Sequence, residues 1–185
     1  MTDLPRDLPR DLRRTLETVV KAARDSAELG AADALRRLGV FDARRPGHLT
    51  DARNQARLRL RAHAKSLGDR LDGPDGATLS RLTEAAAYVQ WHRLLFSRFL
   101  VERGLLRDEA GIALSLADCR EEAAMAGTGD EWSVAAAQTA RMLPGVFPFD
   151  DPAEALTMAP EHAKALRDHL KRLGAAIFQA LDLSH

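Results

Sequence analysis

The stretch LTEAAAYVQWHRLLFSRFLVERGLL, residues 82–106, decides the fold of this chain. A helical period of 100° per residue gathers its polar side chains into one narrow stripe: Thr83, Gln90, Arg93 and Ser97. Most other positions are apolar or aromatic, and a helix of that kind is normally buried on several sides. The stretch therefore predicts the central helix of an all-α domain. Its large apolar side chains are expected in the interior: Tyr88, Trp91, Leu95, Phe96 and Phe99.

Helix-opening residues recur along the rest of the chain. Ser, Thr and Asp before an apolar-periodic segment cap helix N-termini, Ser115 with Asp118 has capping-box spacing, and Pro is tolerated in a first turn. The expected helices start near Pro9, Thr50, Thr78 or Ser80, Ser115, Asp130 and Pro160.

Glycines mark the expected helix ends. Gly104 suits the left-handed position after the central helix, and Gly39 ends the first helix, which Gly30 is expected to break into two pieces. Phe147 and Phe149 follow in a turn-rich segment and are expected against the core.

Length and composition set the domain class. The chain has 185 residues, 45% of them hydrophobic and 29% charged, as in soluble globular proteins. We expect a single helical domain over residues 1–185, with lobes 1–106 and 107–185. No segment alternates like a strand, so the predicted fold is an irregular multi-helix bundle around the one central apolar helix.

Cysteine usage and hydropathy predict the compartment. Cys119 is the one cysteine, which fits a reducing environment. The N-terminal residues MTDLPRDLPRDLRR contain no apolar signal region, and no apolar run approaches the roughly 18 residues of a membrane span. A cytoplasmic protein without a membrane partner is expected.

No catalytic constellation is evident. The six histidines are scattered, without a metal-ligand spacing. Cys119 has no obvious base near it in the sequence, and Gly127-Thr128-Gly129 lacks the Lys and the preceding strand of a phosphate loop. We therefore predict no catalytic, cofactor-binding or metal-ligating residue, and no enzyme activity for the chain by itself.

Charge is distributed unevenly although the net charge is zero. Residues 36–70 carry ten basic and three acidic side chains (+7), whereas residues 108–131 carry one basic and seven acidic ones (−6). Arg53, Arg57, Arg61 and Lys65 recur every fourth residue on one side of the expected helix 51–71, about 6 Å apart along the axis. That spacing predicts contacts with the phosphate backbone of double-stranded DNA. The alternative is a solvated face, or one neutralised by the acidic region.

The central stretch also contains a series of short motifs, and further motifs of the same series lie before and after it. Inside the stretch they are Ala87-Tyr88, Arg93-Leu94, Arg98-Phe99 and Gly104 with Leu106. Outside it they are residues 35–40, Leu143-Pro144 with Phe147, APEH at 159–162 and IFQ at 177–179. The series resembles the N-terminal helical domain of the large adenine-specific DNA methyltransferases of BREX-type (PglX-like) phage defence, and of the related type IIG restriction-modification methylases.

The resemblance implies a non-catalytic domain that helps a methyltransferase bind DNA or partner subunits of the defence system. In that family a catalytic domain follows, with a Gly-rich loop for S-adenosylmethionine and an Asn-Pro-Pro-Tyr motif for the flipped adenine. Here the sequence ends in ALDLSH, residues 180–185, so the resemblance covers the helical domain alone and implies no cofactor in it. The alternative is a free-standing helical module for protein–protein interaction or regulation, without DNA binding.

Overall fold

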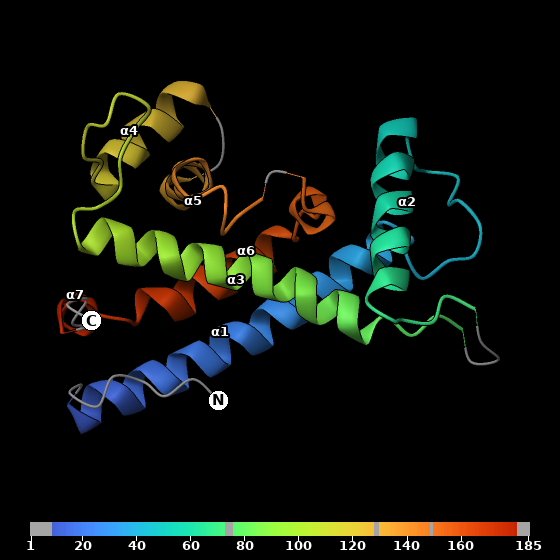
Figure 1. Cartoon of the computed structure of the whole chain (residues 1–185), viewed down its shortest axis with the longest axis horizontal. Coiled ribbons are helices and arrows are strands. Elements are labelled where there is room, and N and C mark those ends of the chain that lie inside the picture. The colour runs from blue at the N-terminus through green and yellow to red at the C-terminus, as the bar shows by residue number, and fades with distance from the viewer. Residues whose placement is uncertain (1–8, 73–75, 128–129, 149, 181–185) are drawn as a thin grey trace. The chain divides into compact units, whose positions relative to one another are not determined.

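The computed structural model describes residues 9–72, 76–127, 130–148 and 150–180. The chain is 66% helical, and extended pairing in the described ranges is limited to two isolated bridges, Arg70–Thr78 and Arg107–Ala113. The all-α prediction is confirmed. The elements, shown in Figure 1, are α1 (Arg10–Arg37), α2 (Asp51–Ser66), α3 (Ser80–Glu102), α4 (Leu116–Ala126), α5 (Glu131–Met142), the 3-10 helix η1 (Pro152–Ala155), α6 (Pro160–Lys171) and α7 (Ala175–Gln179).

Three of the predicted N-caps are confirmed. The side chain of Thr50 accepts a hydrogen bond from the backbone N–H of Arg53 at 3.3 Å and opens α2. Ser115 and Asp118 form a reciprocal capping box at α4. Asp130 accepts from the backbone N–H of Ser133 at 3.0 Å and opens α5. Each cap binds one of the backbone donors that a helix leaves without a partner in its first turn.

Gly39 and Gly104 end α1 and α3 as predicted, with φ of 65° and 62°. After α1, Gly39 donates to the carbonyl of Arg36 and Val40 donates to that of Leu35, which is the Schellman pattern. Val40 and Leu35 are both fully buried, so an apolar contact can accompany the cap.

The expected break of α1 at Gly30 is wrong, because the helix runs without interruption from Arg10 to Arg37. Gly30 is buried, and a β-carbon built on it would lie 2.9 Å from Cβ of His162 and 2.9 Å from Sδ of Met158. The glycine therefore serves close packing against the residues around the start of α6, and not a helix end.

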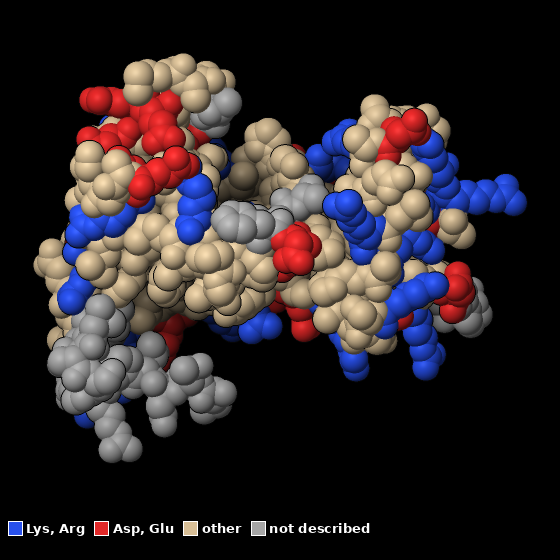
Figure 2. Space-filling view, turned by 45° about the horizontal axis from the view of Figure 1, so that its top comes forward, with Lys and Arg blue, Asp and Glu red and all other residues tan. Residues whose placement is uncertain are grey.

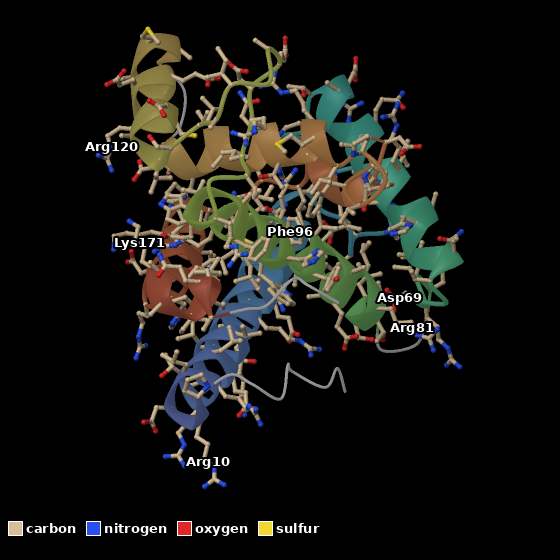
Figure 3. All side chains as sticks on the ribbon, turned by 60° about the vertical axis from the view of Figure 1, so that its left-hand side comes forward. Arg10, Asp69, Arg81, Phe96, Arg120 and Lys171 are labelled. Atoms are coloured by element: carbon tan, nitrogen blue, oxygen red, sulfur yellow. The ribbon has the colours of Figure 1, made fainter. Side chains whose placement is uncertain are left out.

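The start of α3 depends on a residue distant in the sequence. Asp69 follows α2, and its carboxylate accepts from the backbone N–H groups of Arg81 (3.1 Å) and Leu82 (2.8 Å). Arg81 in turn donates from its guanidinium to the carbonyl of Leu67 at 2.6 Å. Asp69 and Arg81 lie next to each other in Figure 3. Asp69 thus binds N–H groups in the first turn of α3, which was expected to be capped by Thr78 or Ser80.

The chain divides into two compact units, and neither is continuous in sequence. Unit 1 combines residues 1–23, 92–148 and 165–185, and unit 2 combines residues 24–91 and 149–164. The long helices α1 and α3 each contribute one part to each unit. The units therefore do not follow a division into residues 1–106 and 107–185.

The core of unit 1 lies around the C-terminal half of α3 and the pair α4–α5. It consists of Leu100, Leu106, Cys119, Ala123, Val134 and Ala135, with Phe96 and Phe99 partly buried against it. The ring centroids of Phe96 and Phe147 lie 6.1 Å apart, and those of Phe99 and Phe178 lie 6.5 Å apart. Phe147 is buried as predicted, and Phe149 lies outside the described residues.

The interior positions predicted for α3 need correction. Tyr88 is 50% exposed, with its ring edge-on to that of Trp91 at 5.5 Å. Trp91, Leu95, Phe96 and Phe99 are only partly buried. The fully buried positions of α3 are mostly small or aliphatic residues: Leu82, Ala86, Ala87, Ser97 and Leu100. Hydrophobicity around the helix did not reveal which side is covered, because small alanines allow the closest approach of neighbouring segments.

Candidate nucleic-acid interface

The basic row lies in unit 2, on the side of α2 that faces the loop after α1. Leu60 and Ala64, four residues apart on one side of α2, are fully buried, and Arg57 has only 3% of its surface exposed. The loop between α1 and α2, residues 38–50, passes over this part of the helix. The middle of the row is therefore covered by the chain's own backbone.

Arg57 binds the loop through three backbone carbonyls. Its Nε donates to the oxygen of Gly39 at 2.7 Å, and its Nη2 donates to the oxygens of Asp42 and of Arg44, the latter at 3.1 Å. Burial, followed by the nearby charge of Arg61, lowers the pKa of the Arg57 guanidinium from its ordinary value. An arginine nonetheless stays protonated at neutral pH, so Arg57 is a buried cation held by carbonyl dipoles.

Arg61 continues the same arrangement one turn later. Its Nη1 donates to the oxygens of Val40 at 2.6 Å and of Asp42 at 2.9 Å. The expectation of four basic heads aligned on one open side is therefore wrong for Arg57 and Arg61. The i, i+4 spacing places the four residues along one side of α2, but on that side Arg57 and Arg61 meet backbone acceptors of the loop.

Arg53 and Lys65, at the two ends of the row, are exposed. Neither forms an ion pair with a carboxylate of the described residues, and the same holds for the exposed side chains of Arg44, Arg59 and Arg70. Figure 2 shows Lys and Arg gathered over α2 and the loops beside it. We call the five exposed residues the basic surface: Arg44, Arg53, Arg59, Lys65 and Arg70.

Two neighbouring arginines differ from the basic surface because carboxylates neutralise them. Arg45 pairs with Asp51 at 2.9 Å and donates to the carbonyl of Leu49. Arg37 pairs with Asp33 at 2.8 Å and donates to the carbonyl of Thr157 at 3.1 Å. Both side chains order the loop ends of unit 2, and their charge is balanced locally.

A small hollow lies next to Arg53, with a volume of about 80 Å³. Two arginines are among its lining residues, and Asp33 already neutralises one of them. Its size is closer to that of one small anionic group than to that of a drug-sized ligand, which needs about 300–1,000 Å³. The lining residues are Ala34, Arg37, Leu38, Arg53, Ala56, Leu156 and Thr157.

Unit 1 contains the acidic segment, and Figure 2 shows Asp and Glu gathered over α4. Two of these acidic side chains stabilise the local structure. Asp118 caps α4, and Glu131 forms an ion pair with Arg120 at 3.4 Å. Arg120 projects from α4 in Figure 3. Cys119 is fully buried, and burial, with smaller contributions from nearby carboxylates, raises the pKa of its thiol to about 11. A thiol of that pKa is a poor nucleophile at neutral pH.

Arg98 of unit 1 lies one helical turn before Glu102 and forms an i, i+4 ion pair with it. The pair is present at 2.7 Å, but only 14% of the Arg98 side chain is exposed. Its guanidinium carbon lies 5.4 Å from the ring centre of Trp132 and 6.0 Å from that of Phe178. The cation joins two aromatic rings of the core and is a packing element of unit 1.

The His, Cys, Asp and Glu side chains of the described residues are dispersed. Across residues 9–72, 76–127, 130–148 and 150–180, no three His, Cys, Asp or Glu side chains are grouped so that they could hold a metal ion. Over the same residues, every helix is too short or too polar to cross a membrane.

Comparison with protein-family models, with curated proteins and with solved structures finds no match to this chain.

Proposed function

We propose that this chain is a non-catalytic helical domain that binds the phosphate backbone of double-stranded DNA, as an accessory region of an adenine-specific DNA methyltransferase of the BREX or type IIG kind. The DNA-binding part is carried by one observation: five exposed cations of unit 2 have no ion-pair partner among the described carboxylates. The methyltransferase part rests on the resemblance of the motif series within residues 35–179.

The chemistry of the basic surface favours phosphates over bases. Four of its five residues are arginines, whose planar guanidinium groups match phosphate oxygens in pairs. Helix α2 contains no Phe, Tyr or Trp on which unpaired bases could stack. Contacts of this kind position a protein on a duplex without reading its sequence.

The number of contacts predicts the salt dependence. Five phosphate contacts on B-form DNA give a slope of log K against log salt of about −4.5. Between 50 and 200 mM salt the affinity is then expected to fall about 500-fold.

The experiment titrates a fluorescent duplex at several salt concentrations. It compares the wild type with a variant in which Arg44, Arg59 and Lys65 are all replaced by Gln. Three lost contacts should reduce the slope to about −1.8, with little change in helical content.

A matched control removes the same charge from unit 1, by replacing Arg14, Lys21 and Lys171 with Gln, three side chains that are also exposed. The control should keep the wild-type slope. Equal slopes in wild type and in the basic-surface variant, or an equal loss in the control, would contradict binding through this surface.

S-adenosylmethionine enters this proposal only through the parent family. The Gly-rich loop that binds it in methyltransferases follows a β-strand, and the described residues form no strand. The proposed role of this chain is DNA contact, and methyl transfer belongs to the catalytic domain of the parent family.

The alternative is a helical module for protein–protein interaction that does not bind DNA. Two apolar side chains of unit 1 favour it, because Met125 is 83% and Ile112 is 63% exposed. Single exposed apolar residues are common on monomers, so this observation carries less weight than the basic surface. Failure of the wild type to bind duplex at low salt would favour the alternative.

A further inference from the structure

We propose that Arg57 and Arg61 are positioning residues, which hold the α1–α2 loop in the shape that presents Arg44 to a DNA phosphate. This inference rests on the proposed function for its DNA part. It assigns a role to the two members of the predicted basic row that do not reach solvent freely.

The two guanidinium groups bind one continuous stretch of loop backbone. Arg57 binds the carbonyls of Gly39, Asp42 and Arg44, and Arg61 binds those of Val40 and Asp42. Four carbonyls within residues 39–44 thus receive five hydrogen bonds from one face of α2. A side chain without such donors would leave the carbonyls of the buried residues Gly39 and Val40 unsatisfied, which is costly.

The geometry favours arginine at position 57, which donates from both Nε and Nη2. A guanidinium offers five N–H donors in a rigid fork, so Arg57 can bind carbonyls that lie in different directions at once. Lysine carries a compact, strongly hydrated ammonium that would have to give up water on burial. The end of α1 adds a second attraction, because Gly39 lies at the negative end of the α1 helix dipole.

Arg44 connects the clamp, by which we mean the hydrogen bonds from Arg57 and Arg61 to the loop carbonyls, to the basic surface. Its carbonyl oxygen accepts from Nη2 of Arg57 at 3.1 Å, while its side chain is exposed. The backbone position from which the Arg44 side chain projects is therefore determined by a buried residue 13 positions away. The clamp carbonyls end at residue 44, and the chain then turns through Pro46 and Gly47 toward the Thr50 cap of α2.

The first readout is amide hydrogen exchange in the Arg61→Gln variant, because Arg61 is only partly buried and its replacement is milder than that of Arg57. Exchange of residues 40–49 should rise at least tenfold, while exchange in α5 of unit 1 stays as in the wild type. Arg61→Lys should restore part of the protection, because both hydrogen bonds of Arg61 come from the single atom Nη1 and an ammonium can donate to two acceptors. Unchanged exchange in the loop would overturn the inference, whatever the DNA result.

The second readout is a double-mutant cycle on duplex affinity, using Arg44→Gln, Arg61→Gln and the combination. One phosphate contact is worth about eightfold in affinity at 0.1 M salt. If Arg61 acts through Arg44, each single variant and the combination should lose about the same eightfold. A loss of about 60-fold in the double variant would mean that Arg61 contacts phosphate itself. An unchanged affinity of Arg61→Gln would mean that the shape of the loop does not affect DNA binding. Either result overturns the inference.

The two readouts separate this inference from the proposed function. No duplex binding by the wild type at low salt would refute the proposed function and the DNA role of Arg44. The exchange measurement would then still decide whether Arg57 and Arg61 hold the loop.

Discussion

Replacing Gly30 by Ala tests how closely α1 packs against the start of α6. Helix propensity alone predicts that Ala in a helix interior stabilises the chain by about 1 kcal/mol relative to Gly. The packing predicts the opposite. The new β-carbon would lie 2.9 Å from Cβ of His162 and 2.9 Å from Sδ of Met158, well inside the usual contact distance of about 3.5–4 Å.

The two contacts differ in how easily they relax. The Met158 sulfur can move by rotating its side chain, whereas Cβ of His162 is attached to the backbone of α6, so the helix itself must shift. Overpacking of this kind costs about 1–3 kcal/mol. After the propensity gain is subtracted, Gly30→Ala is expected to lower the free energy of unfolding by about 1 kcal/mol. Gly30→Val should cost more, because it adds two methyl groups and has a lower helix propensity than Ala.

The assay is urea unfolding followed by circular dichroism, with Leu29→Ala as control. Leu29 is the preceding residue of α1 and is 66% exposed, so its truncation should change stability by less than about 0.5 kcal/mol. A Gly30→Ala variant that is more stable than the wild type by the full propensity gain would refute the close approach.

Three further predictions concern titratable and capping groups. Burial raises the pKa of Cys119 to about 11, so its thiol should react with a disulfide reagent at pH 8 far more slowly in the folded chain than in urea. For the same reason the free energy of unfolding should fall as pH rises from about 9 to about 11. Ser115→Ala removes the capping box and should lower the free energy of unfolding by about 1 kcal/mol. Hydrogen bonds from Ser115 lower the pKa of Asp118, so the stability from this pair should be lost on acidification below about pH 4. Urea unfolding should show this loss in the wild type and not in Ser115→Ala. Burial lowers the pKa of His92, whose ring centroid lies 5.4 Å from that of Phe147. The contribution of the neutral imidazole to the free energy of unfolding should therefore be present above about pH 6.5 and lost as pH falls below it. His92→Gln should remove this part of the acid transition in urea unfolding.

Local signals explain the parts of the fold that the sequence predicts. Thr50, Ser115 and Asp130 act within their own helix turn, and Gly39 and Gly104 act at their own helix end, so each could be recognised from neighbouring residues. The all-α class follows in the same way from composition and periodicity.

The errors concern contacts between residues far apart in the chain. The role of Gly30 depends on His162, and the capping of α3 depends on Asp69, neither of which a local pattern can reveal. The basic row failed at Arg57 and Arg61 for a related reason. Residue spacing shows which side chains share a helix face, but not whether backbone carbonyls of another segment lie against that face.

The discontinuous composition of the two units has a consequence for biosynthesis. A nascent chain that has reached residue 148 has completed neither unit, because unit 2 still lacks residues 149–164 and unit 1 lacks the residues from 165 onward. Contacts such as those from Arg98 to Leu173 and from Arg103 to Phe178 join residues 75 positions apart. Such long closures must lose chain entropy before they gain contacts, which slows folding. Apolar parts of α1 and α3 therefore stay uncovered on the ribosome until α6 and α7 emerge, and both units reach their final packing only after residues 149–180 have been synthesised.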